Sequence, residues 1–103
     1  MSKLRLELFV VGHSPRSQTA VENLRRILDT NLPGEFDLQI IDVLEQPQAA
    51  EDSNILATPT LIRREPPPVR RLLGDLSETE AVVRGLGIED NDGKKGQGGR
   101  DGE

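Results

Sequence analysis

Four arginines surround a run of three prolines, and this segment is the part of the chain best suited to specific chemistry. Arg63 and Arg64 precede Pro66–Pro68, and Arg70 and Arg71 follow the run. Planar guanidinium groups bind carboxylates through paired hydrogen bonds, so the cluster is suited to docking an acidic protein surface. The alternative is that the arginines lie in solvent along two strands and protect a sheet edge. Taken by itself, the cluster favours this second interpretation.

The prolines form a second candidate group. Bonds that precede proline have only a small preference for trans, so these bonds are where the backbone can hold or exchange a cis isomer at low cost. We predict a cis bond between Thr58 and Pro59, against the alternative of a trans proline that simply begins a strand. Pro66, Pro67 and Pro68 either control a conformational change or form a stiff connection, and the sequence leaves both open. Pro59 and the three consecutive prolines are therefore our candidate switch residues.

Catalytic, cofactor and metal chemistry have little support in the sequence. The chain has no cysteine, which excludes thiol catalysis, disulfides and thiolate metal sites. His13 stands beside Ser14 and Ser17, but the sequence places no carboxylate to orient it as a catalytic base, so a loop histidine is favoured. Asp42 and Asp75 adjoin predicted strand ends and are expected to cap turns. We expect no enzyme and no cofactor.

Composition limits the partners and the compartment. The 103 residues suffice for one domain with a modest core, and the net charge of −5 disfavours nucleic acid as a general partner. No apolar run approaches the roughly 20 residues that span a bilayer. The first residues alternate charge with leucine and lack a signal-peptide core. We expect a soluble, cytoplasmic protein that binds no membrane.

Hydrophobic spacing predicts the elements that must position these residues. Residues 4–11 and 36–43 read as strands. Between them a helix of about four turns begins at Pro15 with Ser14 as its N-cap, and Asn31-Leu32-Pro33-Gly34 ends it. Strand, helix and strand over this length form a βαβ unit with parallel strands. The range 47–53 fits a short helix.

The second half of the chain supplies two more strands and a last helix. Strands are predicted at 60–64 and 69–73, and Ser77 with Glu80 forms a capping box for the last helix. The order βαβαββα is that of a thioredoxin-like α/β fold with a mixed four-stranded sheet. We expect this domain to occupy residues 1–88 and the glycine-rich, charged residues 89–103 to be a disordered tail.

Several motifs look like those of the KaiB family of circadian-clock proteins, over roughly residues 4–88. They are Ile41-Asp42-Val43-Leu44, Pro47-Gln48-x-Ala50-Glu51, Ile55-Leu56-Ala57-Thr58-Pro59-Thr60-Leu61, Pro66-Pro67-Pro68-Val69-Arg70-Arg71 and Gly74-Asp75-Leu76-Ser77. The resemblance implies a non-enzymatic regulator that binds the ring of a KaiC-type ATPase and recruits a KaiA-like protein or a clock-output histidine kinase. It also implies that Arg63, Arg70 and Arg71 contact the partner.

The same resemblance implies a protein with two folds. KaiB-type proteins switch between a tetrameric ground-state fold, βαββααβ, and the thioredoxin-like form that binds KaiC, and the half containing the prolines rearranges. Residues 85–92 here contain two glycines and several acids, which is poor strand material for the ground-state fold. We therefore expect the thioredoxin-like form to dominate and to be mainly monomeric.

Two other functions compete with this one. A redox or glutathione-handling enzyme is disfavoured because Ser14-Pro15-Arg16-Ser17 stands where redox members of the fold carry paired cysteines. A redox-inactive thioredoxin-like sensory or interaction module of a histidine-kinase pathway remains the alternative. Asn54 replaces a lysine common in the KaiB family, so affinity or partner choice is expected to differ if this position contacts the partner.

Overall fold

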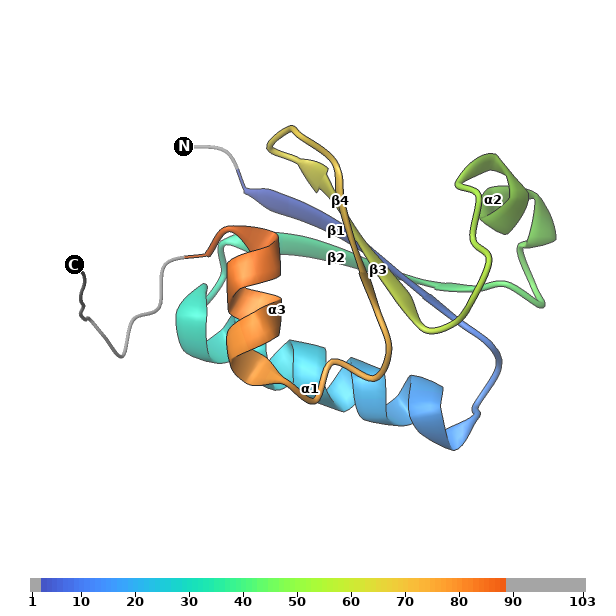
Figure 1. The fold of residues 1–103 in the computed structure, drawn as a ribbon, viewed down its shortest axis with the longest axis horizontal. Helices are drawn as coiled ribbons and strands as arrows, with labels where there is room; N and C mark the ends of the chain where they lie inside the picture. The colour runs from blue at the N-terminus through green and yellow to red at the C-terminus, as the bar shows by residue number, and fades with distance from the viewer. Residues whose placement is uncertain (1–2, 89–103) are drawn as a thin grey trace.

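A mixed four-stranded sheet with the strand order β2-β1-β3-β4 forms the centre of the protein (Figure 1). The computed structural model describes residues 3–88, so the predicted disordered tail lies outside the described residues. The elements in chain order are β1 (Leu4–Val10), α1 (Pro15–Asn31), β2 (Phe36–Asp42), α2 (Pro47–Asp52), β3 (Thr60–Glu65), β4 (Arg70–Leu73) and α3 (Thr79–Leu86). The predicted thioredoxin-like order βαβαββα is confirmed.

The first half of the chain forms the βαβ unit that its periodicity predicts. β1 pairs in parallel with β2 and antiparallel with β3, so it is a central strand. Its burial increases along its length, and Phe9 is fully buried. Ser14 caps α1, because its hydroxyl oxygen accepts a hydrogen bond from the Ser17 amide, and Pro15 occupies the first helical position.

The two faces of the sheet are covered unequally. Helices α1 and α3 cover one face, where most buried apolar side chains form a single cluster, whereas α2 lies against one end of the other face (Figure 1). There Phe9, Ile41 and Ile62 form a small second cluster with Ala49 and Ile55. No residue of α2 is buried. The α2 side of the molecule is therefore the more weakly packed one.

The last helix begins later than the sequence predicts. The prediction that Ser77 and Glu80 form a capping box is wrong. Helix α3 starts at Thr79, and Glu78 in the N-cap position makes no side-chain capping hydrogen bond. The Asp75 carboxylate accepts a hydrogen bond from the Ser77 amide instead. This local turn competes with helix initiation at Ser77 and delays it.

The helix ends in a way that fits the thioredoxin-like form. Leu86 is buried in the main cluster, and Gly87 adopts a left-handed conformation, with φ of 72°, as the C-cap. Ile88 then packs against the same cluster. Within residues 3–88, the segment predicted to be poor strand material is accordingly a helix terminus.

Candidate docking surface

The N-terminus of α1 stands where redox proteins of this fold carry their thiols, but here its hydroxyls are used for structure. The Ser17 hydroxyl oxygen accepts a hydrogen bond from the Val11 amide at 3.1 Å, and the Ser17 side chain is buried. Ser14 is occupied as the helix cap. Because the chain has no cysteine, this end of the molecule offers no dithiol chemistry.

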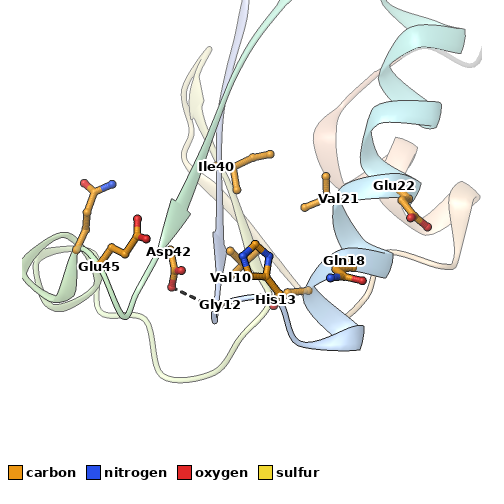
Figure 2. A pocket seen from close by; sticks show the side chains of 11 residues that line it. Val10, Gly12, His13, Gln18, Val21, Glu22, Ile40, Asp42 and Glu45 are labelled. Carbon is orange, nitrogen blue, oxygen red and sulfur yellow. Dashed lines mark hydrogen bonds between the residues drawn. The ribbon is translucent and has the colours of Figure 1, made fainter.

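A pocket of about 430 Å³ opens beside this helix end, between α1 and the ends of β1 and β2 (Figure 2). His13 is exposed at its rim, and Asp42 lies at its β2 side. Asp42 Oδ1 accepts hydrogen bonds from the amides of Gly12 at 3.0 Å and Leu44 at 2.9 Å, which is the predicted turn-capping role. Among residues 3–88 no group of three histidine or acidic side chains is arranged to hold a metal ion.

These backbone bonds predict a specific pH dependence of stability. Bonds from the Gly12 and Leu44 amides lower the pKa of Asp42, and bonds from Ser77 lower the pKa of Asp75. A carboxylate whose pKa is lower in the folded state stabilises the protein above its unfolded pKa of about 4, and this contribution is lost as the pH falls through the folded pKa. We expect Asp42→Asn combined with Asp75→Asn to flatten the decline in the free energy of unfolding between about pH 5 and pH 2.

Urea unfolding at several pH values would measure this effect, and Asp29→Asn combined with Asp37→Asn is the matched control. Both control side chains are exposed. Equal slopes for the two double variants would mean that the backbone bonds of Asp42 and Asp75 do not govern the acid response.

The structure separates the four arginines that the sequence groups together. Arg63 is only 5% exposed, and its guanidinium donates hydrogen bonds to the carbonyl oxygens of Leu86 and Pro68, both at 2.7 Å. Burial, with a smaller contribution from the charge of Arg70, lowers the pKa of Arg63. Arg63 therefore ties β3 to the end of α3 and to the proline loop. In this structure it is not available to a partner, which corrects the prediction for this residue.

Arg64 and Arg71 hold the C-terminal end of α2 against the sheet. Arg64 donates to the Glu7 carboxylate at 2.9 Å and to the Ser53 hydroxyl at 2.6 Å. Arg71 is exposed, and its guanidinium donates to the backbone carbonyls of Ser53 and Asn54. Since α2 has no buried residue, these bonds are important anchors for it. No sequence pattern indicated this role, because Ser53 is remote from both arginines along the chain.

Arg70 differs from the other three arginines. It is exposed and lies directly across from buried Arg63 in the β3–β4 ladder. The ion pairs found among residues 3–88 use Arg5 and Arg64, so no carboxylate there neutralises Arg70. Like charges directly opposite each other in a sheet repel, which leaves this end of β4 with uncompensated positive charge.

The predicted switch residues lie beside β3 and β4, the strands that carry the four arginines. Pro59 is buried immediately before β3, whereas Pro66, Pro67 and Pro68 are exposed between β3 and β4. The peptide bonds before Pro59, Pro66 and Pro68 are cis. The carbonyl of Pro68 accepts the bond from Arg63, so the proline loop is attached to the body of the sheet.

Large apolar side chains are also exposed on this half of the molecule. They are Leu56 at 94%, Leu73 at 71%, Leu44 at 69% and Val69 at 52%. Val69 directly precedes Arg70, and Leu73 lies two residues after Arg71 in β4. Exposed apolar side chains beside an exposed arginine without a carboxylate partner are typical of a surface that binds another protein.

Comparison with known proteins identifies relatives in one family. The family model described as the KaiB domain matches residues 7–88. The circadian clock protein KaiB3 of Synechocystis sp. is 49% identical over 88 residues, covering 85% of this chain and 86% of that protein. The circadian clock oscillator protein KaiB of a Synechococcus strain is 53% identical over 83 residues, covering 81% of this chain and 76% of that protein.

Solved structures agree on the fold. The N-terminal domain of SasA from Synechococcus elongatus has a TM-score of 0.69 and 31% identity, covering 84% of this chain and 81% of that one. Mitochondrial thioredoxin 3 of Saccharomyces cerevisiae has a TM-score of 0.68 at 15% identity, covering 84% of this chain and 79% of that one, and this similarity concerns the fold alone. Within residues 3–88, no helix has the length and apolar character needed to cross a membrane.

Proposed function

The chain belongs to the KaiB family of circadian-clock proteins, and from this membership we propose that it is a non-enzymatic clock regulator that binds the ring of a KaiC-type ATPase. It acts in the cytoplasm in its thioredoxin-like form and recruits or displaces a KaiA-like protein or a clock-output histidine kinase. Family membership supports the regulatory role. The observation that carries the docking site is Arg70, which is exposed, has no carboxylate partner among residues 3–88 and is close to exposed Val69 and Leu73.

We assign direct partner contact to Arg70 and Arg71, and we assign Arg63 to the fold. Arg71 is an exposed residue, and its guanidinium anchors the α2–β3 connection. It therefore links the proposed docking surface, formed by Val69, Arg70 and Leu73, to the segment that carries Leu56. Arg63 acts indirectly, by fixing the proline loop from which β4 begins.

The segment from α2 to β4, which contains Pro59 and Pro66–Pro68, is the part that we propose rearranges between two folds. Its packing supports this proposal, because α2 has no buried residue and β4 contributes only half-buried Leu72 to the main cluster. Weakly packed elements open at a lower free-energy cost than the core of a domain. In contrast, α1 and β1 supply much of the buried cluster and are expected to persist in both forms.

Size-exclusion chromatography with light scattering tests the function directly. The protein is run alone and with a KaiC-type ATPase from the same source. We expect a monomer that joins the ring promptly. A tetramer that joins only over hours would mean that the ground-state fold dominates, and no association would contradict the proposed partner.

The second candidate is a redox-inactive sensory or interaction module of a histidine-kinase pathway. The structural similarity to the SasA N-terminal domain, at 31% identity, supports it. The identity of about half of the residues to KaiB proteins over most of the chain favours the first candidate. Co-purification with a histidine kinase in preference to the ATPase ring would reverse this order.

A further inference from the structure

The outer edge of β4 has backbone groups that point away from the sheet. Among residues 3–88, β4 pairs with β3 alone, and the Gly74 amide donates to the Pro59 carbonyl at 3.0 Å. Gly74 and Pro59 lie directly opposite each other in the register that pairs Leu73 with Thr60. In an antiparallel ladder the residues that bond to the neighbouring strand alternate.

It follows that Leu72 and Arg70 direct their backbone N–H and C=O groups toward β3, whereas Arg71 and Leu73 direct theirs outward. Among residues 3–88, neither outward residue makes a backbone hydrogen bond outside the sheet. Helix α3 packs under Leu72 on one face, where Gly85 approaches the Leu72 side chain. Among residues 3–88 the two outward residues of the edge, Arg71 and Leu73, are exposed. β4 runs in front of the other strands in Figure 1.

The charges along this edge select the kind of strand that can pair with it. β4 reads Arg-Arg-Leu-Leu and contains no acidic residue, and Arg70 faces a second, buried arginine across the ladder. A second copy of the chain would bring four arginines onto one pair of strands, which disfavours self-pairing. A strand that carries carboxylates would instead neutralise Arg70 and Arg71.

We propose that the open edge of β4 takes up an extended acidic segment of the partner protein as a fifth strand. The outward N–H and C=O groups of Arg71 and Leu73 bond to its backbone, and Arg70 and Arg71 bind its carboxylates on opposite faces of the sheet. Main-chain bonds of this kind supply affinity, while side chains on alternate faces supply specificity. The inference rests on the docking role proposed above for these two arginines.

A short peptide tests the edge without the ATPase. The probe is acetyl-Val-Thr-Glu-Glu-Val-Thr-amide, and the control replaces both glutamates with lysine. By NMR, we expect the acidic peptide to slow amide hydrogen exchange of Arg71 and Leu73 by about tenfold or more at saturation, and the lysine peptide to leave it unchanged. Binding of the acidic peptide without slower exchange at these two amides would overturn the proposal, because contact would then involve side chains alone.

Two substitutions at one position separate backbone pairing from side-chain contact. Leu73→Pro removes the outward N–H but keeps the bonds to β3, which belong to Leu72 and Arg70, and proline is tolerated at such edge positions. Leu73→Ala removes the side chain and keeps the N–H. With folding verified by dispersed amide resonances, we expect Leu73→Pro to bind the peptide about tenfold more weakly than Leu73→Ala. Equal affinities would overturn the proposal.

Charge is tested by Arg70→Gln, with Arg25→Gln on the exposed surface of α1 as the matched control. We expect only Arg70→Gln to weaken the peptide, and equal weakening would mean non-specific attraction. These outcomes are distinct from failure of the proposed function. If the ATPase ring binds the protein and Leu73→Pro binds the ring as well as Leu73→Ala does, the edge proposal fails alone. If no ring binds at all, the proposed function fails whatever the peptide does.

Discussion

Replacing Arg63 with alanine is expected to lower the free energy of unfolding by about 2–3 kcal/mol. A hydrogen bond from a charged group contributes about 1.5–3 kcal/mol. Part of this contribution is offset by the cost of burying the cation. The change removes both bonds of the guanidinium, to Leu86 and to Pro68, and leaves two carbonyl oxygens without their donor. Chemical denaturation of the two proteins at one pH would measure the difference.

Two further variants show the origin of this loss. Arg70→Ala changes the same residue type directly across the ladder, but at an exposed position, and is expected to cost no more than about 0.5 kcal/mol. Arg63→Met fills most of the space without donating hydrogen bonds, so it should recover only part of the stability. If Arg63→Ala were as stable as Arg70→Ala, the guanidinium would contribute nothing to the fold and would be free for a partner, as the resemblance to the KaiB family implies.

The misplacement of Arg63 shows what the sequence could and could not provide. Adjacent arginines at 63 and 64 suggest two exposed side chains, yet neighbouring residues on a strand must point to opposite faces. Leu61 and Arg63 share the face under α3, while Arg64 shares the other face with Ile62. The two-residue period of the strand could have placed Arg63 on the same face as Leu61. The acceptors of its hydrogen bonds could not be predicted from the sequence, because they are backbone carbonyls at residues 68 and 86.

Local chemistry predicted the elements well where no competing contact existed. Ser14 and Pro15 begin α1 as expected, and Asp42 caps its turn. The predicted capping box at Ser77 does not form, because the Ser77 amide donates its hydrogen bond to the Asp75 carboxylate instead. The anchoring of α2 by Arg64 and Arg71 depends on residues brought together only by the fold, so no local pattern could reveal it.

Reversing the charge at position 70 is expected to weaken binding to a KaiC-type ring by about 30-fold or more, which corresponds to about 2 kcal/mol. Arg70 is exposed and unpaired among residues 3–88, so in the free protein it lacks a carboxylate that a partner would have to displace. Titration of the ring with Arg70→Glu, followed by fluorescence anisotropy, would give the affinity. The same titration at several salt concentrations should show a shallower dependence for the variant, because one charge pair is lost.

The stability of this variant makes its loss of binding informative. Arg70→Glu places a carboxylate opposite buried Arg63, exchanging a repulsive cross-strand pair for an attractive one, so the fold should be as stable as the parent or slightly more stable. Reduced binding then cannot be attributed to unfolding. Arg25→Glu on α1 makes the same change in net charge away from β4 and should leave affinity nearly unaltered. Equal losses for the two variants would show that overall charge, and not the β4 surface, governs association with the ring.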